Sequence, residues 1–155
     1  MRLSTRVRYA ARIMLDLAPY RDSRPITGKV ISEREGIPRG YLENLMRPLT
    51  AAGLVRAERG TGGGFVLAKP PAQIKLSDIW EAMEGPLCLI DCSRQPDMCL
   101  RYHQCVMRNI WEEAGQAFVA VLESWSLEEM MERSRLDCPD RPDRSAAINE
   151  PGQQS

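Results

Sequence analysis

The chain has 155 residues, 43% of them hydrophobic, so it can bury one real core without disulfides. Its formal net charge is +0, yet residues 1–69 carry 13 Lys and Arg against 6 Asp and Glu, whereas residues 70–155 carry 8 against 15. A basic N-terminal half is expected of a nucleic-acid reader, although a solvated basic face gives the same count. No apolar run approaches the ~18 residues of a membrane span, and the first residues lack a signal-peptide pattern. We therefore expect a cytoplasmic protein with no membrane partner.

The first predicted element is an amphipathic helix. Ser4 suits an N-cap, and apolar residues then recur at three- and four-residue spacing as far as Ala18. Pro19 to Pro25 predicts a connecting loop. Arginines lie at the start of the helix or along its polar face: Arg2, Arg6, Arg8 and Arg12. They can meet DNA phosphates, or only water.

Residues 27–54 hold two short helical patterns joined by a glycine turn at Gly36-Ile37-Pro38 and stopped at Gly53. Such a pair is a helix-turn-helix, whose second helix lies in the major groove with its N-terminal residues on base edges. The candidates for DNA contact are Arg39, Gly40, Tyr41 and Glu43. Glu43 can accept from cytosine and Arg39 can donate to guanine or phosphate, while Tyr41 equally suits core packing. Pro48 is expected to interrupt or kink the second helix.

Two short strand patterns, Leu54–Arg59 and Phe65–Lys69, flank the glycine-rich stretch Gly60–Gly64. They predict a hairpin that follows the helix-turn-helix as its wing. At its tip Gly60 lets the backbone approach DNA, and Arg59 can reach into a minor groove. A phosphate-cradling nucleotide loop is the competing interpretation, and it is weak because no Gly-Lys-Ser/Thr follows.

Residues 88–108 hold four of the five cysteines and the only histidine. Cys92, Cys99 and Cys105 are separated by six and then five residues, wide enough for a loop to fold three thiolates around iron or zinc. The competing interpretation is reduced surface thiols, or half-buried ones that pack as small hydrophobes. Disulfides are not expected, because the chain lacks the marks of a secreted protein.

Three further elements complete the chain. A short helix with apolar residues from Leu76 to Met83 is predicted to be capped near Ser77, and another short, acidic helix starts at Ser126. Between them a long helix carries an apolar stripe: Met107, Ile110, Trp111, Ala114, Phe118, Val121, Leu122 and Trp125. The stripe suits a symmetric dimer interface, but it could also pack on its own domain. From Asp137 the chain reads as a disordered tail, with Cys138 a bystander.

These motifs resemble the Rrf-two family of winged-helix transcription regulators, and most of all its iron–sulfur cluster regulators. The resemblance spans residues 1 to about 135 and rests on these motifs: Arg2-Leu3-Ser4, Tyr9-Ala10, Met14-Leu15-Asp16-Leu17-Ala18, Ile31-Ser32-Glu33-Arg34, Gly36-Ile37, Tyr41-Leu42-Glu43, Gly53-Leu54-Val55, Arg59-Gly60, Gly62-Gly63-Gly64 and three cysteines before Ile110-Trp111. It implies a homodimer on a pseudo-palindromic double-stranded operator. It also implies that Tyr41, Glu43 and Arg59 touch DNA, and that Cys92, Cys99 and Cys105 hold a cluster.

The chain departs from the family pattern at the fourth cluster ligand. Arg108 stands where those regulators have a histidine, and a guanidinium stays protonated and cannot realistically ligate iron. A nitric-oxide-sensing branch uses a carboxylate at the position of Arg8, so that route is closed as well. The candidates left are His103, Cys88, Asp91, Asp97 or a residue of the partner subunit, with His103 the best single one.

The sequence therefore predicts a mainly α fold with a small β-hairpin, namely a winged helix-turn-helix domain plus a long dimerisation helix. The expected divisions are a DNA-binding domain at 1–85, a cluster loop at 86–106, the dimerisation and C-terminal helices at 107–136, and a disordered tail at 137–155. The expected function is DNA-binding regulation modulated by an iron–sulfur cluster, with 2Fe–2S favoured over 4Fe–4S. The alternatives are a zinc-bound or metal-free regulator acting through protein partners, or a small electron carrier. With one histidine and no catalytic constellation, no enzyme is expected.

Overall fold

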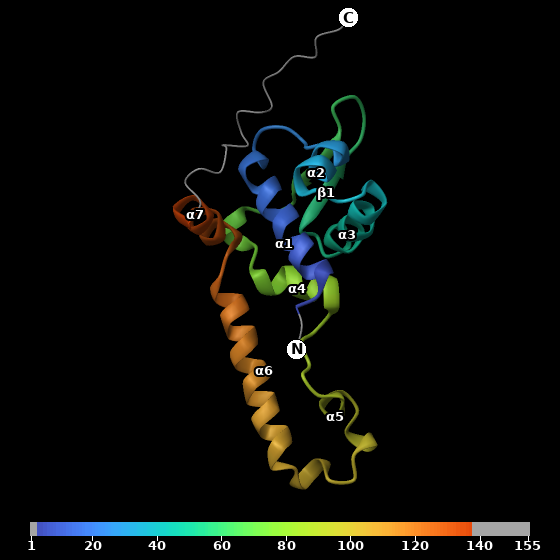
Figure 1. Cartoon of the computed structure of the whole chain (residues 1–155), viewed down its shortest axis with the longest axis vertical. Helices are drawn as coiled ribbons and strands as arrows, with labels where there is room; N and C mark the ends of the chain where they lie inside the picture. The colour runs from blue at the N-terminus through green and yellow to red at the C-terminus, as the bar shows by residue number, and fades with distance from the viewer. Residues whose placement is uncertain (1–2, 138–155) are drawn as a thin grey trace, which may run out of the picture.

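The computed structural model describes residues 3–137 and is mainly helical, with one antiparallel hairpin in that range (Figure 1). The helices are α1 (Thr5–Leu17), α2 (Gly28–Glu35), α3 (Arg39–Ala51), α4 (Leu76–Glu84), α5 (Asp91–Arg94), α6 (Val106–Ser124) and α7 (Leu127–Asp137). The hairpin pairs β1 (Val55–Glu58) with β2 (Gly64–Leu67), with Val55 opposite Leu67. The predicted fold class is confirmed. The proposed boundaries between domains stay a prediction.

Side chains cap the helices that the sequence pattern predicted. Ser4 caps α1, because its Oγ accepts from the Val7 amide at 3.2 Å, and Thr27 caps α2 in the same way. The predicted cap near Ser77 is wrong by two residues. The N-cap of α4 is Lys75, whose backbone amide donates to the Asp78 carboxylate at 2.7 Å. That carboxylate satisfies a backbone donor just before the helix, so α4 begins at Leu76, the first residue of the apolar pattern, and not after Ser77.

The turn between α2 and α3 is fixed by backbone geometry. Gly36 takes a left-handed conformation with φ 65°, and the Ser32 hydroxyl donates to the Ile37 carbonyl across the turn. At the far end of α3 the amides of Gly53 and Leu54 donate back to the last turn, which closes a Schellman motif. Pro48 was expected to interrupt α3, but the helix continues to Ala51 because the proline falls in the last turns.

A third extended segment joins the hairpin. Ile26 pairs with Phe65 by two backbone hydrogen bonds of 2.9 and 3.0 Å on the free edge of β2. A Cβ on Gly64 would lie 2.4 Å from the Ile26 carbonyl oxygen, so this pairing requires glycine there. The sequence interpretation assigned the glycines of the wing to DNA approach, yet at Gly64 contact within the chain explains the residue.

One hydrophobic core is shared by helices α1, α2, α3, α4 and α7 and by the hairpin. We call this part of the structure the body. Leu127, the first residue of α7, is fully buried in it beside residues of α1 and α4. The chain returns to the body through a short antiparallel pairing, in which the Leu76 amide donates to the Trp125 carbonyl at 2.9 Å and the Leu127 amide to the Ile74 carbonyl at 2.8 Å. The helix that ends the described chain is therefore packed on the DNA-binding unit.

Residues 86–125 form an arm that extends away from the body (Figure 1). The arm leaves through Gly85, passes α5 and two 3₁₀ turns, Pro96–Met98 and Tyr102–Gln104, and comes back along α6. No residue of α6 is buried. It contacts the body through the Phe118 ring, which meets Trp80 of α4 in an edge-to-face arrangement with ring centroids 5.4 Å apart. Among the described residues, no helix is long and apolar enough to cross a membrane.

Candidate DNA-binding surface and cysteine segment

The recognition helix α3 presents a polar face to solvent. Arg39, Gly40 and Glu43 are exposed, as a base-reading role requires. Asn44 and Arg47 are exposed one turn further on, and the sequence interpretation missed them. Helical spacing could have found both, because they follow Gly40 and Glu43 by four residues. The opposite face of α3 is buried in the core through Leu42, Leu45, Met46 and Leu49.

Tyr41 belongs partly to the core. Its ring meets the Tyr9 ring of α1 edge to face, with centroids 5.9 Å apart and an interplanar angle of 84°. It is half-buried and packs against the hydrophobic core. The packing role that the sequence left open is thus present. Contact of Tyr41 with DNA stays a prediction. In such a contact, packing against Tyr9 would hold the Tyr41 ring in place.

The tip of the wing is exposed. Arg59 and Gly60 lie on it with high exposure, and Gly60 and Gly62 take φ values of 104° and 83°, which favour glycine. A Cβ on Gly63 would lie 2.4 Å from the Glu58 carbonyl oxygen, so the tight turn itself requires that glycine. The tip therefore has a defined shape from which Arg59 projects. Arg8 is exposed on α1, whereas Arg2 lies outside the described residues.

The four cysteines of the arm that the structure describes are reduced and half-buried. Cys92 lies in α5, Cys99 follows the first 3₁₀ turn, and Cys105 precedes α6. Nowhere in residues 3–137 do three or more His, Cys, Asp or Glu side chains gather as a metal site would require. Of the remaining predicted ligands, Asp97 is exposed, and the side chain of Asp91 lies outside the described part. Cys138, which the sequence predicts to be a bystander, lies outside it as well.

Two polar contacts hold the cysteine segment against α6. The Ser93 hydroxyl donates to the Glu112 carboxylate at 2.8 Å. Arg108 donates to the Tyr102 carbonyl at 3.0 Å and stacks its guanidinium over the Tyr102 ring at 4.3 Å. The segment around Cys99 lies between these two anchors.

The donor set fits an iron–sulfur cluster in its chemistry. Three reduced thiols lie on one short segment, and thiolates are the ligands that iron–sulfur clusters use. Arg108 is engaged with Tyr102 and cannot serve as a cluster ligand. The imidazole of His103 is exposed, and its ring meets the Tyr102 ring edge to face with centroids 5.2 Å apart. To bring three donors together, the part of the segment between the two anchors would have to close.

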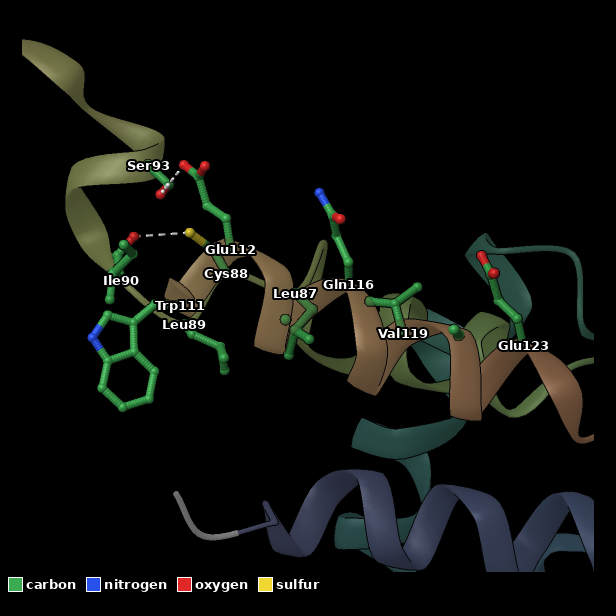
Figure 2. Close-up of a pocket in the computed structure, with 12 residues that line it drawn as sticks. Leu87, Cys88, Leu89, Ile90, Ser93, Trp111, Glu112, Gln116, Val119 and Glu123 are labelled. Atoms are coloured by element: carbon green, nitrogen blue, oxygen red, sulfur yellow. Dashed lines mark hydrogen bonds between the residues drawn. The ribbon is translucent and has the colours of Figure 1, made fainter. Parts of the chain in front are cut away.

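A cleft of about 450 Å³ separates the start of the arm from α6 (Figure 2). Leu87, Leu89 and Ile90 form one wall, and α6 forms the other with Trp111 and Val119. The Cys88 thiol points toward the Ile90 carbonyl and donates to it at 3.0 Å (Figure 2). Cys88 is therefore engaged within this cleft, and its service as a fourth ligand would require that bond to break.

The helix-turn-helix with an exposed recognition face and a glycine-tipped wing defines a winged-helix DNA-binding regulator. A family model described as Rrf2, iron-dependent transcriptional regulator, matches residues 3–133. The chain belongs to the Rrf2 family. Its members are transcription regulators and not enzymes, which confirms the expected class.

Three relatives place the chain more closely. It is 35% identical to Protein rrf2 of Nitratidesulfovibrio vulgaris over 90% of this chain and 92% of that protein. The solved structure of T. potens IscR matches with a TM-score of 0.72 and 32% identity over 88% of this chain and 90% of that chain. CymR of B. subtilis, described as the global cysteine regulator, matches with a TM-score of 0.73 and 32% identity over 86% and 98%. The expected family is confirmed, with IscR among the similar proteins, and the comparisons add a protein described as a cysteine regulator at similar likeness.

Proposed function

We propose that this protein is a homodimeric, sequence-specific regulator whose operator binding is modulated by an iron–sulfur cluster. The observation that carries the proposal is the direct contact between the cysteine segment, residues 88–105, and helix α6. The cysteine segment is anchored at both ends to α6, and α6 is the uncovered helix on which a second copy would pack. A change in the cysteine segment therefore acts directly on the helix that would set the distance between two recognition helices.

In this proposal the body reads the operator. The first turn of α3, with Arg39, Tyr41 and Glu43, faces base edges in the major groove, and Arg59 at the wing tip reaches an adjacent minor groove. Arg8 on α1 contacts a phosphate, and so does Arg2, which lies outside the described residues. Such contacts position the body without reading sequence. Asn44 and Arg47 extend the same exposed face of α3.

Within the arm, Cys92, Cys99 and Cys105 hold the cluster, with His103 as the favoured fourth ligand and Cys88 as the alternative. A bound cluster of the 2Fe–2S type supplies a redox centre that oxygen, nitric oxide or iron supply can alter. Arg108 keeps the turn before Cys105 on α6, so the last thiol starts from a fixed position. Closure then involves the segment that carries Cys99.

Dimerisation through α6 follows from its exposed apolar side chains. Val121 is 58% exposed and Ile110 48%, which is unusual for large apolar residues on one helix. A cytoplasmic protein with this face uncovered would associate through it, and a two-fold interface uses the same patch twice.

The decisive experiment compares two forms of the protein. Protein purified without oxygen should contain stoichiometric iron and sulfide and select one class of sequence from a randomised duplex pool. A Cys92→Ala/Cys99→Ala/Cys105→Ala form should be folded, lack iron and differ in operator affinity by the 5–150-fold typical of allosteric coupling, roughly 1–3 kcal/mol. His103→Ala and Cys88→Ala then identify the fourth ligand by the change in the visible spectrum.

Three outcomes would count against the proposal in different ways. Absence of iron in the anaerobic protein would remove the cluster, and identical selected sequences and affinities for the two forms would remove the regulation by it. Failure to select any sequence would remove the DNA-reading role itself.

A second candidate function is regulation without a metal. The observation in its favour is that the described residues gather no metal-binding group, although the four thiols are reduced and accessible in part. A metal-free regulator that acts through a protein partner would resemble this structure, and the similar protein CymR is described as a cysteine regulator. Iron and sulfide analysis separates the two candidates.

A further inference from the structure

Two crossed ion pairs join α1 to α2. Arg12 of α1 places its Nε 2.7 Å from the Glu35 carboxylate of α2, and Arg34 of α2 places its Nη1 3.5 Å from the Asp16 carboxylate of α1. Both carboxylate side chains are fully buried. Since buried carboxylates are strongly disfavoured without partners, each pair fixes one end of the contact between the two helices.

Arg12 makes further contacts that lead toward α3. Its Nη2 donates to the Glu35 carbonyl at 3.3 Å, at the last residue of α2 before the Gly36 turn. Its guanidinium lies over the Tyr9 ring, 5.2 Å from the centroid. Tyr9 in turn meets Tyr41, in the first turn of α3, edge to face. Arg12 thus contacts two features that orient α3. One is the end of α2, just before the turn that leads into α3, and the other is the Tyr9 ring, which packs against Tyr41 in the first turn of α3.

We propose that Arg12 is a positioning residue for DNA reading, and this inference rests on the proposed function. Carbonyls at a helix end lack intrahelical partners, so the bond to Glu35 restrains the direction in which the chain leaves α2. The guanidinium of Arg12 stacks on the Tyr9 ring, and this ring packs against Tyr41. In this proposal Arg12 acts through α3, because its Nε and Nη2 serve Glu35. Half of its side chain is exposed, and the salt series below tests whether that half also meets phosphate.

The molecule contains a matched control. Arg34 makes the same kind of buried ion pair between the same two helices, but it stacks on Tyr20, in the turn after α1, at 5.2 Å. Neutralisation of Arg34 should weaken the α1–α2 contact as neutralisation of Arg12 does, but it should leave the packing of Tyr9 against Tyr41 unchanged. Arg8, which is exposed on α1, is the control for an arginine that meets phosphate.

The test uses the full chain and a duplex selected by the wild-type protein from a random pool, with a scrambled duplex of equal length. Affinities are measured over a salt series for Arg12→Gln, Arg34→Gln and Arg8→Gln. We expect Arg12→Gln to lose roughly tenfold or more of the selected-to-scrambled ratio with an unchanged salt slope. Arg34→Gln should keep the ratio, and Arg8→Gln should lower the slope by about one while it keeps the ratio.

Two more variants guard against misfolding. Arg12→Lys keeps a cation beside Glu35 but lacks the planar fork, so it should fold and recover only part of the ratio. Arg12→Gln/Glu35→Gln removes both charges together and should show the loss of Arg12→Gln. An undiminished ratio in the folded variants would overturn the inference, as would a drop in slope like that of Arg8→Gln. If wild-type protein itself does not discriminate, the proposed function fails, which is a different result.

Discussion

The body and the arm differ in how they are held together. The body buries a continuous core, whereas α6 in the arm has no buried residue. Of the large hydrophobic side chains that are exposed in the described residues, all but Leu3 and Leu136 lie in the arm. A region that exposes so much apolar surface lacks a core of its own. The body thus has a core that specifies its shape, while the arm leaves apolar surface uncovered.

The difference matches a division of labour. DNA reading needs groups held in fixed geometry, and the body supplies it through buried ion pairs and a closed helix-turn-helix. The sensing that we propose would need an element with two arrangements of similar energy, and we assign that role to the cysteine segment of the arm. Substitutions placed in the body or in the arm test this difference.

The largest expected effect falls on the arm. Val121→Glu should bury an unpaired charge in the proposed α6 interface and cost about 3–5 kcal/mol of association, the cost typical of an uncompensated buried charge. Sedimentation should show a dimer for the wild type and a monomer for the variant. The exposed neighbour Glu113, changed to Gln, is the control and should stay dimeric. A dimeric Val121→Glu protein would show that the stripe is not the interface.

Phe118 is a less direct probe of the same interface. Its ring already packs against Trp80 of the body, so Phe118→Glu would disturb the chain's own α4–α6 contact as well as a dimer. Phe118 of the apolar stripe thus packs within the chain, whereas Val121 is the residue that we propose packs between chains. The sequence pattern could not separate them, because both residues fit the same helical spacing.

The second prediction tests whether α7 belongs to the body. Leu127→Ala should lower the free energy of unfolding by about 2–5 kcal/mol, since the side chain is fully buried and leaves a cavity. Leu136→Ala, on the same helix but 78% exposed, should change it by less than about 0.5 kcal/mol. Urea unfolding of the two variants gives both values. Equal effects would mean that α7 is not part of the core.

Local sequence signals predicted most of the body. The helices followed from apolar spacing with Ser4, Gly36 and Gly53 at their ends, and the hairpin from its glycine tip. Ile26 was missed as a strand, because a single pairing with Phe65 leaves no alternating pattern. The return of α7 to the core was missed for a similar reason. It depends on two backbone hydrogen bonds between Ile74–Leu76 and Trp125–Leu127, which join residues far apart in the chain.

The candidate site was predicted unevenly. Arg39, Glu43 and Arg59 could be placed on the surface, because helical and hairpin periodicity determine which way a side chain faces. The buried partners Glu35 and Asp16 could not, since polar residues give no sign of burial in a sequence. Spacing also says nothing of whether Cys92, Cys99 and Cys105 meet, because a loop has no period from which distance follows.

The third prediction compares how the body and the arm affect DNA binding. Arg59→Ala should cost about 1–3 kcal/mol on the selected operator and much less on scrambled DNA, because the wing reads sequence-dependent groove shape. Arg8→Ala should weaken both duplexes alike and lower the salt slope by about one. Binding isotherms over a salt series separate the two effects. Undiminished discrimination in Arg59→Ala would remove the wing from the reading surface.

The smallest expected effect lies at the point where the arm rejoins the body. Ser126 caps α7, and its hydroxyl accepts from the Glu129 amide at 3.2 Å while its own amide donates to the Glu129 carboxylate at 2.7 Å. Ser126→Ala should therefore cost about 0.5–2 kcal/mol in urea unfolding at neutral pH. The exposed Glu128, changed to Gln, is the control for the loss of one carboxylate beside the cap.

This cap should also depend on pH. The hydroxyl of Ser126 and then its backbone amide hold the pKa of Glu129 below its ordinary value of 4.5, because both bonds favour the carboxylate. A carboxyl whose folded pKa is depressed stabilises the fold above its unfolded pKa, and the benefit disappears as the pH falls through the folded value. The stability difference between wild type and Glu129→Gln should thus shrink below about pH 4.5. A difference that stays constant to lower pH would show that Glu129 acts without its charge, and the junction would then be held by the backbone pairing alone.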